Sequence, residues 1–267
     1  MRPEIIAIAN QKGGVGKTTI AYQVGITLSL KYKYRVLLVD LDPQGNLSTR
    51  VIKNNTKLEC SLSRDLFNKE DVQIVPTKID SLGLSIIPCE MNDSKLSAVE
   101  SKTSSSELDC LKKHMAEIEG HYDFILIDTA PSMGKKLIAT LCYATSVISP
   151  IKLSSLSLSG LRGHFDIMKS IRRNSNKDLK LLGVVANLYN NRRSKDSIIY
   201  AQLQDQLGDL MFNTRLSDRL PIEESMDKGV PIWDLKMSHK ESALIEVDNL
   251  VSEVLTKVGS QPLQEAV

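Results

Sequence analysis

The stretch from Lys12 to Thr19 constrains the fold of this chain more than any other, because it places three glycines and two lysines between an apolar run and an amphipathic segment. The apolar run covers residues 5–9 and the amphipathic segment covers residues 20–30, so the pattern predicts a strand, a glycine loop and a helix. Glycines have no Cβ, so backbone N–H groups in such a loop can approach an anion closely. The first turn of the following helix would point its unpaired N–H groups at the same anion. The stretch therefore predicts a phosphate-binding loop.

Two side chains of this loop have the chemistry that a nucleoside triphosphate requires. Lys17 supplies a positive charge for the β- and γ-phosphates, and the Thr18 hydroxyl is placed to bind Mg²⁺. The residues expected to contact the nucleotide are Gly13, Gly14, Val15, Gly16, Lys17, Thr18 and Thr19. A glycine turn between an unrelated strand and helix is the alternative interpretation, and bare glycine patterns are common enough to keep it in view.

Length and composition predict one large α/β domain. The chain has 267 residues, of which 42% are hydrophobic, and this is still compatible with a single core. We expect one ATPase domain over residues 1–258, a polar tail over residues 259–267, and no DNA-reading domain ahead of the first strand. The net charge is only +2, so a nucleic-acid surface would have to be a local patch. The four cysteines are far apart, which argues against a zinc site, an iron–sulfur site or a disulfide framework.

Two further apolar runs end in aspartate. Residues 36–40 end in Asp40 and are followed by Asp42, and residues 124–128 end in Asp128. Continuous apolar runs of this length are typical of strands buried on both faces of a parallel sheet. Ligands of such sheets bind at the carboxyl ends of the strands, so we expect the aspartates near the nucleotide. The chain is thus predicted to be a doubly wound, mostly parallel α/β sheet flanked by helices. The alternative for Asp40 and Asp42 is that they only cap the next turn.

Three strings carry a resemblance to a known family. Residues 12–19 read K-G-G-V-G-K-T-T, residues 36–46 read V-L-L-V-D-L-D-P-Q-G-N, and residues 125–131 read I-L-I-D-T-A-P. The first string departs from G-x-x-x-x-G-K-[ST] because Gln11 occupies the first glycine position. Together the strings resemble the deviant Walker A class of P-loop ATPases, the ParA/MinD family, and most closely its ParA/Soj-type partition ATPases.

The resemblance implies a hydrolytic site that uses ATP and Mg²⁺. In this family the first lysine of the loop, here Lys12, reaches the nucleotide of a partner subunit, while Lys17 is the ordinary P-loop lysine. The hydrolytic aspartate would be Asp42, which orients the attacking water. Asp128 would hold the metal in the Walker B position, with Asp40 as a supporting carboxylate. Asn187, at the end of another apolar run, resembles the side chain that contacts adenine, and a turn-forming asparagine is its alternative.

Basic residues are concentrated between residues 162 and 195, where nine lysines and arginines stand against two aspartates. Such a cluster of basic residues most commonly forms a solvent-exposed helix face. The alternative interpretation is a surface that binds phosphate backbones without sequence preference. The resemblance favours nonspecific DNA. The candidate DNA-binding residues are Arg192, Arg193, Lys195, Arg215 and Arg219.

The resemblance implies a homodimer bridged by ATP that holds DNA, partitions a plasmid or chromosome, and is stimulated by a ParB-type centromere-binding protein. We expect a cytoplasmic, nucleoid-associated protein with no membrane partner. From residue 241 onward five acidic residues stand against one lysine, so a basic membrane-targeting tail is not expected. Two alternatives stay open. One is a related ATPase that positions another cargo, and the other is a small-molecule synthetase or kinase with a substrate pocket that the sequence does not reveal.

Overall fold

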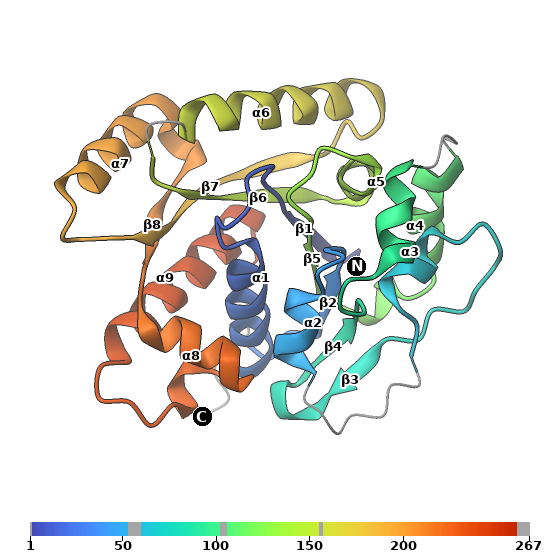
Figure 1. Cartoon of the computed structure of the whole chain (residues 1–267), viewed down its shortest axis with the longest axis horizontal. Helices are drawn as coiled ribbons and strands as arrows, with labels where there is room; N and C mark the ends of the chain where they lie inside the picture. Colours follow the sequence, from blue (N-terminus) through green and yellow to red (C-terminus); the bar gives the residue numbers. More distant parts are fainter. Residues whose placement is uncertain (1, 53–59, 102–105, 155–156, 261–267) are drawn as a thin grey trace.

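The computed structural model describes residues 2–52, 60–101, 106–154 and 157–260, and they form one eight-stranded sheet covered by helices (Figure 1). The strand order is β3-β4-β2-β5-β1-β6-β7-β8. The strands are β1 (Glu4–Ile8), β2 (Val36–Asp40), β3 (Thr77–Ile79), β4 (Leu84–Ile87), β5 (Phe124–Asp128), β6 (Ser146–Lys152), β7 (Lys180–Tyr189) and β8 (Met211–Ser217). Neighbouring strands pair in parallel except β3 and β4. The predicted doubly wound, mostly parallel sheet is confirmed.

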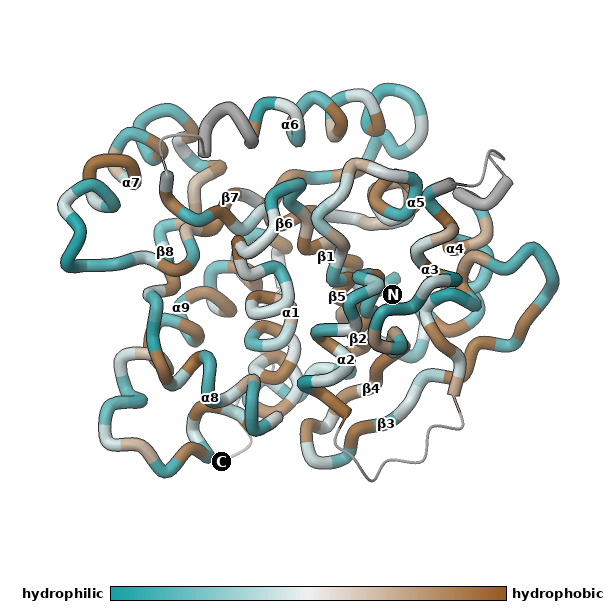
Figure 2. The backbone as a smooth tube through the Cα atoms, in the orientation of Figure 1, coloured by the Kyte–Doolittle hydropathy of each residue, from teal (hydrophilic) through white to brown (hydrophobic). Residues whose placement is uncertain are grey.

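The central strands are buried on both faces. Every residue of β2 and β5 is buried, and Figure 2 shows that the central strands are mostly hydrophobic, whereas hydrophobic and polar residues alternate along α6 and α7. Successive side chains of β1 enter different cores, because Ile6 and Ile8 belong to one cluster while Ile5 and Ala7 belong to another. The pattern of period two is that of a strand between two helical layers.

Helices form a layer on each face of the sheet. The α-helices are α1 (Lys17–Ile26), α2 (Asn46–Val51), α3 (Ser94–Ala98), α4 (Ser106–Ala116), α5 (Lys135–Tyr143), α6 (Ser157–Asn174), α7 (Ser194–Leu207), α8 (Leu220–Lys228) and α9 (Glu241–Val258). The shorter helical turns are η1 (Thr27–Lys31), η2 (Ser63–Phe67), η3 (Asp80–Leu82), η4 (Val99–Ser101), η5 (Glu119–His121), η6 (Gly208–Leu210) and η7 (Ile232–Asp234). Helices α1, α2, α8 and α9 share one core cluster, and α3, α4, α5 and α6 share the cluster on the other face, where α6 and α7 also cover β6 to β8.

The sheet brings the ends of three strands together. In the register of the sheet Asp128 lies beside Ile8 of β1 on one side and beside Asp40 of β2 on the other. The loops that follow β1, β2 and β5 therefore leave the sheet at the same edge. This edge contains the glycine loop and all three predicted aspartates.

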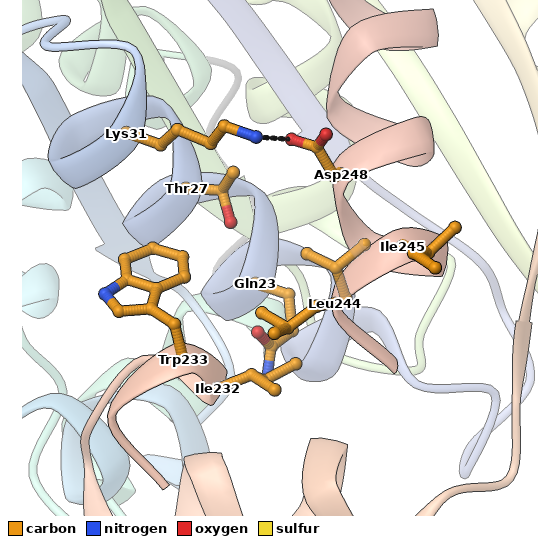
Figure 3. A pocket seen from close by; sticks show the side chains of 9 residues that line it. Gln23, Thr27, Lys31, Ile232, Trp233, Leu244, Ile245 and Asp248 are labelled. Atoms are coloured by element: carbon orange, nitrogen blue, oxygen red, sulfur yellow. Dashed lines mark hydrogen bonds and ion pairs between the residues drawn. The ribbon is translucent and has the colours of Figure 1, made fainter. Parts of the chain in front are cut away.

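A hollow of about 340 Å³ opens elsewhere, between α1, η7 and α9 (Figure 3). Its walls are mainly apolar and include Trp233 and Leu244, with an ion pair between Lys31 and Asp248 on one side. It touches α1 at Gln23 and in the turn that follows the helix, away from the glycine loop at the other end of α1. Within the described ranges, no helix combines the length and the apolar character that crossing a membrane requires.

Candidate nucleotide-binding site

The glycine loop between β1 and α1 has the backbone of a phosphate cradle. Gly14 has φ of 68° and Gly16 has φ of 87°, both in the left-handed region that glycine adopts without strain. Gly16 is also the residue before α1, so the loop ends where the N–H groups of the first helical turn begin. A Cβ at Gly16 would lie 1.8 Å from Nδ2 of Asn187, so any other residue would have to displace that side chain. The geometry suits an anion bound over the end of α1.

Asn187, at the carboxyl end of β7, supports this loop directly. Its side chain is buried, with 1% of the residue exposed, and its Nδ2 donates a hydrogen bond of 2.9 Å to the backbone oxygen of Val15. The side chain thus fixes the loop just before Gly16. Its predicted contact with adenine stays a prediction, and bracing of the loop is the role that its contacts give it.

Thr18 and Asp128 meet, although 110 residues separate them in the sequence. The Thr18 hydroxyl donates a 2.7 Å hydrogen bond to Oδ2 of Asp128. Asp128 is 1% exposed, and within the described part of the chain its buried Oδ1 has no hydrogen-bond partner. Burial and the nearby Asp40 carboxylate raise the pKa of Asp128 well above its usual value. The Thr18 hydroxyl and the unsatisfied, buried carboxylate oxygen of Asp128 are suitable oxygen ligands for Mg²⁺, so these residues fit the metal.

Lys17 brings a positive charge to the same place. The residue is only 6% exposed, and its Nζ donates a 3.3 Å hydrogen bond to the backbone oxygen of Lys12, across the loop. Burial lowers the pKa of Lys17 below its usual value, and the carboxylates of Asp128 and Asp42 offset only part of this effect. The ammonium group is held inside the curve of the loop, where phosphate oxygens would meet it.

Asp40 holds the turn that follows β2. It is fully buried, and its Oδ2 accepts hydrogen bonds from the backbone N–H and the hydroxyl of Ser48, at 2.9 and 2.7 Å. Its Oδ1 accepts a 3.1 Å bond from the backbone N–H of Asp42. Burial raises the pKa of Asp40 to about 6. These contacts are those of the turn-capping alternative, and a role beside Mg²⁺ stays a prediction.

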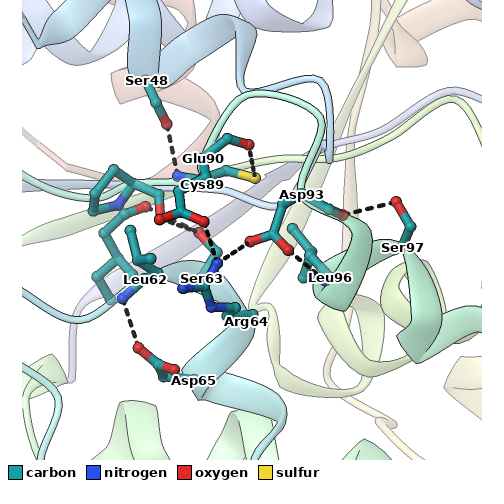
Figure 4. Close-up of polar contacts among 12 residues, drawn as sticks. Ser48, Leu62, Ser63, Arg64, Asp65, Cys89, Glu90, Asp93, Leu96 and Ser97 are labelled. Carbon is teal, nitrogen blue, oxygen red and sulfur yellow. Dashed lines mark hydrogen bonds and ion pairs between the residues drawn. The ribbon is translucent and has the colours of Figure 1, made fainter.

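Asp42 lies in this turn, 8% exposed, with its Oδ1 accepting a 3.0 Å hydrogen bond from the backbone N–H of Gln44. The turn is attached to the segment after β4, because Ser48 Oγ accepts a bond from the Cys89 N–H and Pro43 O accepts one from the Asp93 N–H. Figure 4 shows this segment, from Cys89 through Asp93 to the start of α3. The position of Asp42 is therefore set by hydrogen bonds within its own turn and by the hydrogen bonds that attach this turn to the segment after β4.

Lys12 differs from the other lysine of the loop. It is exposed, and its Nζ lies 3.4 Å from the hydroxyl of Ser154 in the segment before α6. Its backbone N–H donates to Oδ1 of Asn10, which in turn is bonded to the backbone of β6. The loop backbone is thus fixed while the side chain remains on the surface, where a second molecule could meet it.

A hollow of about 280 Å³ lies next to the loop and is lined by residues of α1, β7 and α8, among them Thr19, Asn187 and Arg219. Arg219, a candidate DNA-binding residue, lines this hollow and binds Glu246 Oε1 through two nitrogens, at 3.0 and 2.8 Å. An ion pair between Arg50 and Asp227 lies on the same hollow. No sequence pattern predicts these two pairs, because the partners come from helices that are distant in the chain.

The other basic candidates do not form one uniform group. Arg192, Arg193 and Lys195 are exposed where β7 turns into α7. Arg215 lies on β8, with its guanidinium carbon 4.4 Å from the ring centre of Tyr189 and 5.2 Å from that of Tyr200. Arg215 is also exposed, but only the three residues at the start of α7 lie close together in the sequence on one turn.

Comparisons with known proteins agree with this geometry. A family model described as an AAA domain matches residues 3–181. The chromosome partitioning protein ParA of Caulobacter vibrioides is 31% identical over 95% of this chain and 94% of its own. The chromosome-partitioning ATPase Soj of Treponema pallidum is 30% identical over 96% of this chain and 98% of its own.

A similar solved structure is described as the cobyrinic acid a,c-diamide synthase of Mycobacterium smegmatis with a bound ATP analogue and magnesium. It has a TM-score of 0.72 and 26% identity, and the match covers 97% of this chain and 96% of that one.

Proposed function

Because this chain belongs to the ParA-type family of P-loop ATPases, we propose that it is a partition ATPase whose ATP-bound form is a DNA-binding dimer. The observation that carries the proposal is the meeting of Lys17, Thr18 and Asp128 at the carboxyl edge of the sheet, with the second lysine, Lys12, exposed beside them. An ordinary P-loop ATPase requires the first three groups. The exposed lysine is the feature that a second subunit would use.

ATP and Mg²⁺ are the cofactors. The loop N–H groups and Lys17 fit the phosphates, and the Thr18 hydroxyl with the buried carboxylate of Asp128 fits the metal. When bound, the metal supplies positive charge that offsets the charge of the phosphates during transfer to water. Lys17 adds its own charge from a buried position, where electrostatic stabilisation is stronger than in water.

Asp42 is the residue proposed to orient the attacking water. It is almost buried, and its own backbone and one carboxylate oxygen are held by the turn after β2. Catalysis of phosphoryl transfer depends on positioning of the reactants together with electrostatic stabilisation, so a carboxylate with a fixed orientation is well suited to the role. The contacts of Asp40 with Ser48 and Asp42 keep this turn rigid.

The dimer is proposed to form around the nucleotide. Each Lys12 would leave Ser154 and neutralise phosphate charge on the opposite subunit, so the triphosphate would bind the dimer more tightly than the separate chains. A ligand with that preference shifts the population toward the dimer. ADP, which lacks the γ-phosphate, would shift it less.

The surface proposed for DNA consists of Arg192, Arg193 and Lys195. Their exposed positive charge suits the phosphate backbone, and contacts of this kind are salt-sensitive and carry no sequence information. In a dimer the surface would be present twice, which strengthens binding to one DNA molecule. A ParB-type centromere-binding partner would stimulate hydrolysis and release the DNA, and the protein would act in the cytoplasm on the nucleoid.

One experiment separates this function from its alternatives. Retention of nonspecific DNA is measured at several salt concentrations with ATP, with ADP and without nucleotide. The proposal predicts retention with ATP that decreases steeply with salt and that ADP does not support. Equal retention in all three conditions would contradict it. ATP hydrolysis without any DNA retention would favour an ATPase that positions another cargo or a small-molecule enzyme.

A further inference from the structure

An ion pair between a buried lysine and a partly exposed glutamate lies behind the loop that follows β5, outside the nucleotide site. Glu100, the residue before the end of η4, meets the first turn of α5. Its Oε2 accepts a 2.6 Å hydrogen bond from the backbone N–H of Lys135, and its Oε1 lies 3.4 Å from the Ser132 hydroxyl. A Cβ at Gly134 would lie 1.7 Å from Oε2, so the chain passes the carboxylate as closely as glycine allows. Glu100 therefore holds the loop after Asp128 at its far end.

Lys136 is the basic partner of this carboxylate. The residue is 4% exposed, its Nζ is 3.6 Å from Glu100 Oε1, and it donates a 3.3 Å hydrogen bond to the backbone oxygen of Leu96. Burial lowers the pKa of Lys136 below its usual value, and the carboxylates of Glu100 and Asp42 offset only part of this effect. The ammonium group thus joins Glu100 to the backbone of α3.

The carbonyl that receives Lys136 is itself fixed. Leu96 belongs to α3, whose first turn is capped by Asp93, since Oδ1 of Asp93 accepts a 2.9 Å bond from the Leu96 N–H (Figure 4). Arg64 donates a 3.0 Å bond to the other carboxylate oxygen of Asp93. The backbone of Asp93 also donates to Pro43, in the turn that carries Asp42. One set of contacts therefore joins the loop after β2 to the loop after β5.

We infer that the ion pair of Glu100 and Lys136 positions the Asp42 turn and residues 129–134 for ATP hydrolysis. Lys136 is a positioning residue in this arrangement, because it acts through Asp42 and through the loop. The inference rests on the proposed ATPase function, and it assigns a role to two residues that contribute no group to the phosphate loop.

Stability alone is a weak explanation for this ion pair. The side chain of Lys136 is 5% exposed and that of Glu100 is 29% exposed, so the cost of removing the ammonium group from water offsets much of the attraction between the two charges. An apolar residue of similar length at position 136 would fill the same space without that cost. The connection between the Glu100 carboxylate and the Leu96 backbone is what such a residue could not supply.

The first test compares Lys136→Met with Lys136→Arg and with Lys135→Met. Lys135 is the matched control, because it is the adjacent lysine and contributes its backbone N–H to the contact with Glu100. We expect Lys136→Met to lower kcat about tenfold or more with KM for ATP within about twofold of the parent value, as loss of an interaction made in the transition state requires. Lys136→Arg keeps the charge and should recover most of kcat, and Lys135→Met should leave both constants unchanged.

The second test does not depend on activity. Amide hydrogen exchange of residues 129–136 is measured in the nucleotide-free full chain, with Glu100→Gln as an additional variant. Faster exchange in Lys136→Met and Glu100→Gln, confined to this loop and the turn after β2, is expected. Unchanged exchange together with parental kcat in Lys136→Met would overturn the inference while leaving the ATPase function standing. Absence of hydrolysis in the parent protein would count against the proposed function, and the exchange result would still decide whether the ion pair orders the loop.

Discussion

The phosphate loop and the basic turn at the start of α7 both carry positive charge for phosphate groups, yet they are built in opposite ways. Lys17 of the loop is buried, and its ammonium is bonded to the loop backbone. Arg192 and Arg193 are exposed, on a turn where the Arg192 N–H is bonded to the Asn190 side chain. The first region is organised before any ligand arrives, and the second presents long side chains that would become ordered on binding.

The difference indicates that the loop would supply selective affinity for a nucleotide, whereas the basic turn would adapt to different arrangements of a DNA backbone. A buried charge in a fixed loop selects one ligand geometry and does not have to be reorganised when the ligand binds. Exposed arginines accept many arrangements of a phosphate backbone, but each contact costs side-chain entropy. Salt also weakens the binding of these arginines to phosphate. If the two regions are as separate as their structures imply, a substitution in one should leave the function of the other unchanged.

Lys17→Ala should remove nucleotide binding, with a loss of affinity of about 1,000-fold or more, because a buried charge and its phosphate contacts disappear together. The measurement is equilibrium binding of a fluorescent ATP analogue. Lys12→Ala is the matched control, since it removes a lysine from the same loop at an exposed position, and it should keep ATP binding. Similar affinities of the two variants for the ATP analogue would show that Lys17 contributes no more to nucleotide binding than Lys12 does.

Asp42→Ala should lower kcat by about 100-fold, the usual size of the contribution from a group that positions or activates a water molecule. Nucleotide binding should persist, so the protein should stay on DNA when ATP is present. Phosphate release and DNA retention are measured on the same sample. A variant that hydrolyses ATP at the parental rate would move the hydrolytic role away from this turn.

Replacing Arg192 and Arg193 together by glutamate should weaken DNA binding by about 10- to 100-fold and reduce its salt dependence, with ATP affinity unchanged. The control carries the same change of charge at Arg172 and Arg173, which are exposed near the end of α6. Filter retention at several salt concentrations distinguishes the two variants. Loss of binding in the α6 variant alone would place the DNA surface on that helix.

A further effect concerns the stability of the fold and His164, which is fully buried on α6 and has no hydrogen-bond partner for either ring nitrogen among the described residues. Burial and the nearby charge of Lys17 lower the pKa of His164 to about 4. The unfolded chain binds this proton more readily between pH 4 and the usual histidine value, so the contribution of His164 to stability is lost as the pH falls through that window. At pH 5 the loss should be about 2 kcal/mol relative to pH 7.5.

Denaturant unfolding of the parent protein and of His164→Gln at these two pH values measures the contribution of His164 to the free energy of unfolding. The difference between the two proteins should change with pH by the amount given above, because carboxylates that also titrate are common to both. A difference that is the same at both pH values would show that His164 is not sealed from water in the folded state.

The sequence was sufficient for the parts of the fold that follow from periodicity and strand order. Lys17, Thr18 and Asp128 could be placed together because parallel strands deliver their carboxyl ends to one edge. Strand β3 could not be predicted, since three residues show no period. The contact of Asn187 with the loop, and the ion pair of Glu100 with Lys136, depend on how distant elements pack. No local pattern encodes them.

The most direct test of the account is the mass of the protein in solution, measured by light scattering or sedimentation, for the parent chain and for Lys12→Ala. With a nonhydrolysable ATP analogue and Mg²⁺ the parent should have twice the mass of one chain, and Lys12→Ala should bind the analogue and remain a single chain. A parent protein that stays monomeric when saturated with the analogue, or a Lys12→Ala variant that dimerises equally well, would contradict it.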